Sequence, residues 1–169
     1  NKNKSFDSNE PFSDSSGNGK RDHDPFSELQ GLPRLKELYL FENRINELSS
    51  MSNLPSLEIL LLGANELKNA NDFKDYTSLR RLVLSDNHLS DVRGLFDMTN
   101  LEYLYLTENR LGDLRALRKL TSLRELHLQH NHFTDIHPVA NLVELRVLGL
   151  SGNFVSDVSP IRRLENLTR

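Results

Sequence analysis

Residues 101 to 111 read LEYLYLTENRL, and residues 123 to 133 read LRELHLQHNHF. The same arrangement of leucines and asparagine starts at residues 35, 57, 79, 101, 123 and 145, so that each start lies 22 residues after the previous one. An unbroken period of this length is typical of a solenoid, in which every repeat forms one coil and stacks against its neighbours. A single coil cannot bury its leucines alone, and the sequence therefore predicts one continuous core shared by all the repeats.

The shared pattern, L-x-x-L-x-L-x-x-N-x-(L/I/F/V), resembles that of the leucine-rich repeat family. The resemblance implies an α/β repeat solenoid, a horseshoe with a concave parallel β-sheet and short 3₁₀ or loop segments on the convex side. The second half of each repeat favours 3₁₀ geometry because its apolar residues recur every three positions. Pro138 and Pro160 lie in these halves, where they would damage the interior of an α-helix.

The repeats and their flanks predict the domain organisation. Residues 1–25 are polar, with Phe6 and Phe12 as their only large apolar side chains, and we expect a disordered tail there. Residues 26–169 are expected to form the leucine-rich repeat domain, with a partial repeat at 26–34, six full repeats, and a truncated seventh from residue 167. Because no polar cap closes this last repeat, we expect the chain to be a fragment of a longer protein.

Composition excludes several classes of partner and chemistry. The 169 residues carry a net charge of -3, contain no cysteine, and hold no apolar run approaching the roughly 20 residues of a membrane-spanning helix. Membrane insertion, disulfides and thiolate chemistry are therefore not expected, while a cytoplasmic, a secreted and a cell-surface location all stay open. Nucleic acid is not an expected partner, because no aromatic residues interleave with the basic residues of the second halves. Those basic residues are Arg93, Arg115, Arg118, Lys119, Arg162 and Arg163.

The strand motif predicts which side chains face a partner. Counting from the first leucine of each repeat, positions 4 and 6 point into the core, so positions 3 and 5 point out over the concave sheet. The residues there, together with Phe41 at position 7, form an apolar and aromatic strip rimmed by charge, a composition that marks protein-binding surfaces. The predicted binding residues are Tyr39, Phe41, Ile59, Leu61, Arg81, Val83, Tyr103, Tyr105, Glu125, His127 and Val147.

Three histidines in the stretch HLQHNH raise the alternative of a metal site. His127, His130 and His132 occupy positions 5, 8 and 10, and so leave the chain in different directions. Neighbouring strands, about 4.8 Å apart, could still bring Glu108 near His130. We predict that the chain holds no metal and no other cofactor, and that these histidines are solvated or contact a partner.

Catalysis and small-molecule substrates are not expected either, because the chain contains neither a G-x-S-x-G elbow nor a glycine-rich phosphate loop. The asparagine at position 9 of every repeat is predicted to satisfy backbone groups at the turn after the strand. Four aspartates are predicted to cap the following turn, namely Asp91, Asp113, Asp135 and Asp157. Both sets are therefore interpreted as structural.

Within the family, second halves such as DIHPVANLVEL and DVSPIRRLENL resemble two groups of proteins. These are the leucine-rich regulatory subunit of protein phosphatase 1 and the internalin-type bacterial surface proteins. The resemblance implies a non-catalytic scaffold or adaptor that recognises a protein partner on its concave face. Two alternatives stay open: a bacterial surface or secreted adhesin-like protein, and the sensor region of a larger enzyme.

Overall fold

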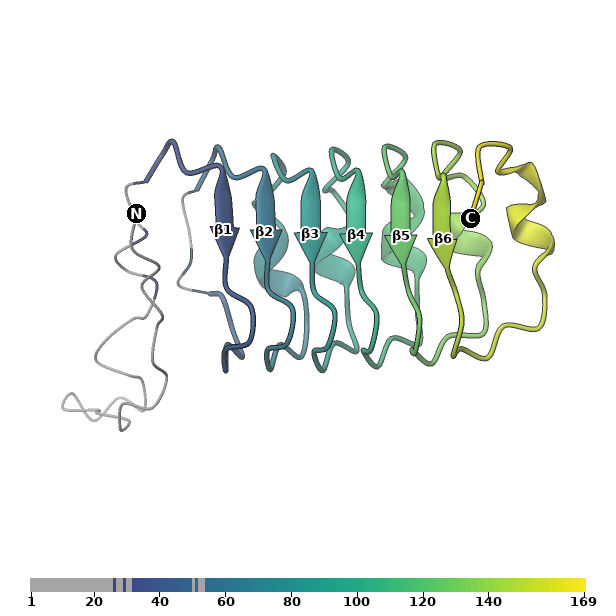
Figure 1. Cartoon of the computed structure of the whole chain (residues 1–169), viewed down its shortest axis with the longest axis horizontal. Coiled ribbons are helices and arrows are strands. Elements are labelled where there is room, and N and C mark those ends of the chain that lie inside the picture. Colours follow the sequence, from purple (N-terminus) through teal and green to yellow (C-terminus); the bar gives the residue numbers. More distant parts are fainter. Residues whose placement is uncertain (1–25, 27–28, 30–31, 50, 52–53) are drawn as a thin grey trace.

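The structure, a computed structural model, describes residues 26, 29, 32–49, 51 and 54–169, which form one row of stacked coils (Figure 1). The tail predicted at residues 1–25 lies outside the described residues. Each coil runs from a short strand through a turn to a segment on the opposite side, and then returns to the next strand.

The strands form a six-stranded parallel sheet in chain order. They are β1 (Glu37–Tyr39), β2 (Ile59–Leu61), β3 (Arg81–Val83), β4 (Tyr103–Tyr105), β5 (Glu125–His127) and β6 (Val147–Gly149). The register pairs equal positions of successive repeats, as in Leu82 with Leu104 and Leu104 with Leu126. The predicted horseshoe with a parallel sheet is confirmed, because a constant period of 22 keeps every strand aligned with the next.

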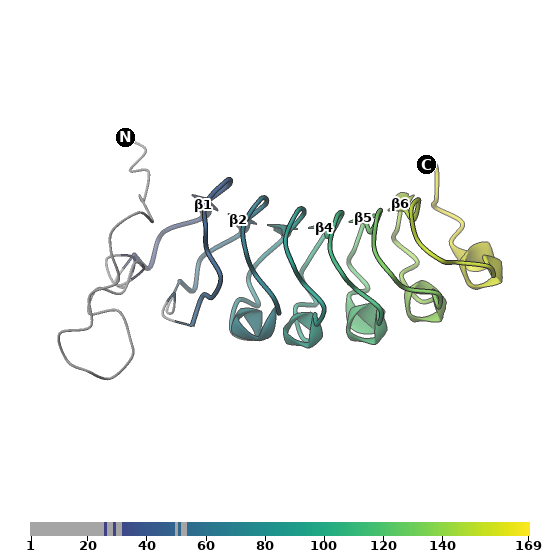
Figure 2. The ribbon, with the colours of Figure 1, turned by 90° about the horizontal axis from the view of Figure 1, so that it is seen from below.

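The opposite side carries short 3₁₀ segments, as predicted (Figure 2). They are η2 (Asn71–Phe73), η3 (Arg93–Leu95), η4 (Arg115–Lys119), η5 (His137–Val139) and η6 (Ser159–Arg163). Pro138 and Pro160 lie at the start of η5 and η6, where no backbone N–H is needed. The predicted aspartate caps are present: Asp91 and Asp135, for example, accept hydrogen bonds from the backbone N–H two residues later at 2.9 and 2.8 Å.

The core fills the space between the sheet and the 3₁₀ segments. Leu60, Leu82, Leu104 and Leu126 occupy position 4 of their repeats and have no solvent-exposed surface. Their neighbours at positions 3 and 5 are half-buried on the outer side of the sheet. The inward and outward alternation that the sequence predicted is therefore confirmed for the central coils.

A ladder of buried asparagines holds the turns after the strands. The Asn109 amide nitrogen donates to the carbonyl oxygens of Leu84, Leu106 and Thr107 at 2.9, 3.1 and 3.3 Å. Its Oδ1 atom accepts the backbone N–H of Leu89 at 2.9 Å. One side chain thus joins two coils by satisfying four backbone groups, and Asn65, Asn87 and Asn131 repeat the arrangement.

Replacing Asn109 by alanine is expected to lower the free energy of unfolding by roughly 2 kcal/mol, because buried backbone groups lose their partners while water entering the vacated space replaces some of them. Urea unfolding measures the change. The matched control is Asn100→Ala, which removes an exposed amide donating to one carbonyl oxygen, that of Thr77, at 2.9 Å. Equal losses in the two variants would contradict the structural role of the buried ladder.

Candidate functional site

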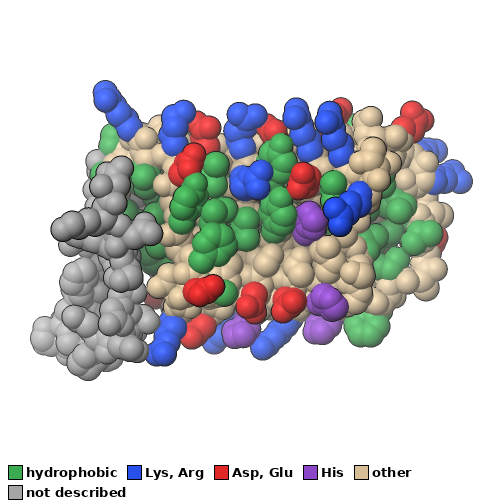
Figure 3. All heavy atoms as spheres, in the orientation of Figure 1, with side chains coloured by type: hydrophobic (Ala, Val, Ile, Leu, Met, Phe, Trp, Pro, Cys, Tyr) green, Lys and Arg blue, Asp and Glu red, His purple; other side chains and the backbone are tan. Residues whose placement is uncertain are grey.

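The outward positions of the strands form the concave face, which is turned toward the viewer in Figure 3. Apolar side chains gather over the N-terminal half of this face, and charged side chains follow both of its edges. Tyr39 and Phe41 are 57% and 47% exposed, whereas the other nine predicted binding residues are half-buried. Most of the predicted binding side chains are thus only partly accessible to solvent, whereas the rings of Tyr39 and Phe41 in the first coil are exposed.

The middle of the face is organised by an arginine stacked on a tyrosine. The guanidinium carbon of Arg81, on β3, lies 4.3 Å from the ring centroid of Tyr103 on β4. It also lies 5.9 Å from the ring centroid of Tyr105, on the same strand. A cation over an aromatic face is attracted by the ring quadrupole, so the Arg81 head group is held above β4.

The next strand continues this arrangement with a second stack. The rings of Tyr105 and His127, register partners on β4 and β5, lie 4.7 Å apart and 7° from parallel. The Tyr105 hydroxyl donates to a Glu125 carboxylate oxygen at 2.8 Å, and His127 Nε2 lies 3.8 Å from the same carboxylate. Burial, together with this hydrogen bond, raises the pKa of Tyr105 above its ordinary value.

Five of the predicted residues therefore contact one another across three strands. We call this set the concave cluster: Arg81, Tyr103, Tyr105, Glu125 and His127. Of the remaining predicted residues, Val83 lies on β3 with Arg81 and is the register partner of Tyr105. The others lie on either side of the cluster: Tyr39, Phe41, Ile59 and Leu61 toward the N-terminal end, and Val147 on β6.

Side chains at position 7 also contribute to the concave face, although the sequence analysis predicted only Phe41 among them as a binding residue. The Thr107 hydroxyl donates to the side-chain oxygen of Gln129 at 2.9 Å, and Gln129 Nε2 lies 3.3 Å from His127 Nδ1. Gln129 fits because Gly149 has no side chain, leaving the space that the Gln129 amide occupies. The signal was present in the sequence, since Thr107 and Gln129 share the column of Phe41.

The three histidines of HLQHNH have separate surroundings. His127 belongs to the concave cluster, the His130 ring lies over Gly152, and the His132 ring centroid is 6.2 Å from that of Phe154. Among the residues that the structure describes, no three histidine, aspartate, glutamate or cysteine side chains are grouped so that they could hold a metal ion.

Comparisons with known proteins match this geometry. A leucine rich repeat family model matches residues 77–133, and a model of two leucine rich repeat copies matches residues 121–163. Internalin C2 from Listeria monocytogenes is 31% identical in sequence to this chain, and its crystal structure superposes with a TM-score of 0.64. The match covers 80% of this chain and 70% of internalin C2. The chain belongs to the leucine-rich repeat family.

Two further solved leucine-rich repeat structures are similar, each 26% identical to this chain. One, from Leptospira interrogans, has a TM-score of 0.66 and matches 83% of this chain and 43% of its own. The other is the ectodomain of the plant membrane receptor kinase GASSHO1/SCHENGEN3 from Arabidopsis thaliana, in complex with Casparian strip integrity factor 2. Its TM-score is 0.68, and the match covers 78% of this chain and 17% of the ectodomain.

A search of curated proteins found no match to this leucine-rich repeat chain. Proteins of the family are generally scaffolds for protein interaction and typically lack catalytic activity. In the part of the chain that the structure describes, no helix has the length and apolar character needed to cross a membrane.

Position 8 of this leucine-rich repeat has a backbone conformation that the sequence did not predict. Glu42, Ala64, Asp86, Glu108 and His130 have φ angles between 53° and 56°, and Gly152 has a φ of 72°. This left-handed region is unfavourable for residues other than glycine by roughly 1 kcal/mol. The turn after each strand requires it, and the asparagine that follows supplies compensating hydrogen bonds.

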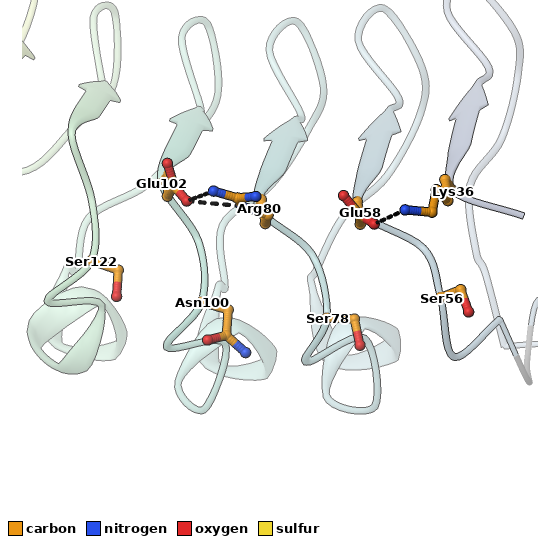
Figure 4. A pocket seen from close by; sticks show the side chains of 8 residues that line it. All are labelled: Lys36, Ser56, Glu58, Ser78, Arg80, Asn100, Glu102 and Ser122. Atoms are coloured by element: carbon orange, nitrogen blue, oxygen red, sulfur yellow. Dashed lines mark hydrogen bonds and ion pairs between the residues drawn. The ribbon is translucent and has the colours of Figure 1, made fainter. Parts of the chain in front are cut away.

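A row of ion pairs at position 2 runs across the sheet, just before the N-terminal ends of the strands (Figure 4). Lys36 Nζ lies 2.7 Å from a Glu58 carboxylate oxygen, and Arg80 Nε donates to Glu102 at 2.8 Å. The Lys36 hydrogen bond holds the pKa of the Glu58 carboxyl below its usual range. The row lines a shallow polar groove with Ser56, Ser78, Asn100 and Ser122. Because these charges pair between coils, they are already partnered within the chain.

The convex side differs in one respect from the sequence interpretation. Lys119 Nζ lies 3.9 Å and the Arg118 guanidinium carbon 5.4 Å from the ring centroid of Phe96. An aromatic residue therefore does lie among the basic residues, contrary to what the sequence suggested. The period explains the contact, since Arg118 occupies position 18 and packs beside Phe96, the residue 22 positions earlier.

Proposed function

We propose that this chain is a non-catalytic scaffold that binds a protein partner on its concave face. One observation supports the proposal: the residues of the concave cluster contact one another through ring contacts and a hydrogen bond across β3, β4 and β5. Aromatic and arginine side chains that are rigid before binding lose little conformational entropy when they contact a partner. Residues 26–169 would act as one recognition domain.

A second candidate is a bacterial surface or secreted adhesin-like protein, which the similarity to internalin C2 favours. The similarity to a receptor kinase ectodomain likewise favours the sensor region of a larger enzyme. In a scaffold, an adhesin-like protein or a sensor region, the concave face would be the recognition surface. The same experiment therefore tests the site for each of these functions.

Capture of partners from the native extract on the immobilised chain tests the concave face. Tyr105→Ala is expected to reduce the captured partner by about 30-fold, because aromatic residues at the centre of an interface dominate binding energy. His130→Ala, an exposed change at the turn edge, is expected to leave capture unchanged. Quantitative mass spectrometry measures both, with thermal unfolding to check that each variant is folded. Equal capture by Tyr105→Ala and the unaltered chain would contradict the proposed site.

A further inference from the structure

We propose that Arg81 is the subsite for a carboxylate side chain of the partner. The carboxylate would belong to an extended segment that also places an apolar side chain against Ile59 and Leu61 on the neighbouring strand. This inference rests on the proposed function of the concave face and adds the chemistry of what the face recognises.

Arg81 has more hydrogen-bond donors than its contacts within the chain use: it interacts with the Tyr105 hydroxyl, which partly offsets the rise in the pKa of Tyr105 that burial causes, but a guanidinium carries five N–H groups. The guanidinium group contacts the Tyr103 ring, with its carbon 4.3 Å from the ring centroid. A guanidinium can contact an aromatic ring through its carbon and still direct N–H groups from its edge to another acceptor. A planar carboxylate can accept two parallel hydrogen bonds from that edge, a geometry that a lysine cannot offer.

Among the described residues, Arg81 has no acidic partner, unlike Arg80, the preceding residue, and unlike two arginines of the convex side. Arg80 pairs with Glu102, Arg93 with Asp91 and Arg115 with Asp113. Arg81 makes no ion pair with any residue in the described part of the chain. A half-buried positive charge without a counter-ion is electrostatically complementary to a carboxylate brought by a partner.

The strands beside Arg81 carry apolar side chains at their outward positions. Ile59 is its register partner on β2, and Leu61 and Val83 lie at the next outward positions of β2 and β3. Apolar side chains thus border the strand of Arg81, and a partner segment packed on them would exclude water from the pair and strengthen its charge-assisted hydrogen bonds.

The spacing suits one short segment. Neighbouring strands are about 4.8 Å apart, and alternate side chains of an extended peptide are roughly 6.6 Å apart on one face. The Arg81 head group lies above β4, two strands or roughly 9.6 Å from β2, so an apolar residue against Ile59 and a carboxylate at Arg81 can come from residues two to four positions apart in one extended chain.

The acidic residue of the concave cluster, Glu125 on β5, already has polar partners within the chain. The Glu125 carboxylate already accepts the Tyr105 hydroxyl and lies 3.8 Å from His127 Nε2. Gln129 and Thr107 complete the polar contacts around His127. Glu125 thus has polar partners within the concave cluster, whereas no acidic side chain of the described residues forms an ion pair with Arg81.

A phage-displayed library of random linear peptides, selected on the full chain, tests the inference. We expect the selected peptides to be enriched in aspartate or glutamate close to an apolar residue, and Arg81→Glu to abolish the acidic enrichment. Arg162→Glu makes the same charge change on the convex side and should leave the enrichment intact. Acidic enrichment that persists in Arg81→Glu, or no acidic enrichment on the unaltered chain, would overturn the inference.

A double-mutant cycle on one selected peptide identifies the pair directly. Arg81→Gln and replacement of the peptide glutamate by glutamine should each weaken binding about tenfold, and together should weaken it little more than either alone. If the two substitutions together weakened binding by the product of their separate effects, Arg81 and the peptide glutamate would not interact and the assignment would be wrong. The capture experiment separates this inference from the proposed function. If the Arg81→Glu chain captures as much partner as the unaltered chain while Tyr105→Ala captures little, the scaffold function stands and the carboxylate subsite is contradicted.

Discussion

Leu104→Ala is expected to lower the free energy of unfolding by about 2 to 5 kcal/mol, whereas Tyr105→Ala, one residue later on β4, lowers it by about 1 kcal/mol. Leu104 has no exposed surface and lies in the middle of the core between Leu82 and Leu126. Alanine there leaves a cavity that the flanking coils cannot close without losing their own contacts.

Tyr105 is the matched control because it shares the strand but faces outward. Its removal forfeits one stacked ring and one hydrogen bond at a half-buried surface, without creating an internal cavity. Urea unfolding followed by circular dichroism measures both variants. If the two substitutions destabilised the chain equally, the inward and outward assignment of positions 4 and 5 would fail, and the concave face would lose its basis.

Gly94→Ala is expected to destabilise the chain by roughly 3 kcal/mol or more, because η3 packs directly on the backbone of the previous coil. A Cβ atom at Gly94 would lie 2.6 Å from the carbonyl carbon of Ala70 and 2.8 Å from Cα of Asn71, and closer still to the Ala70 oxygen. Backbone atoms cannot rotate away as a flexible side chain can. The two coils would have to separate, which exposes part of the shared core.

Gly112 offers the matched comparison, since no heavy atom lies within 4 Å of a Cβ built there. Gly112→Ala is expected to leave stability unchanged or to raise it by up to about 1 kcal/mol, through the lower entropy of the unfolded chain. The difference between the two urea midpoints is the measurement. Similar midpoints in the two variants would mean that the coils adjust to the added methyl group, against the close packing described above.

The sequence alone determined the architecture, the direction of the core side chains and the role of the asparagines. These follow from a single fact, the constant period of 22, because equal spacing places equal positions in register and leaves only one face of each strand for the core. A pattern repeated six times needs no knowledge of particular contacts. The candidate residues of the concave face were predictable for the same reason, as members of outward-facing columns.

The tertiary structure decided how neighbouring columns interact. The sequence placed Arg81 near Tyr103 but could not show that the guanidinium stacks on the ring, or that Tyr105 pairs with His127 and Glu125. It did not distinguish Gly94 from Gly112, or predict the left-handed backbone at position 8. Each of these depends on side-chain rotamers and on the distance between coils. Such quantities arise from packing between residues 20 to 25 positions apart, and a pattern within one repeat does not contain them.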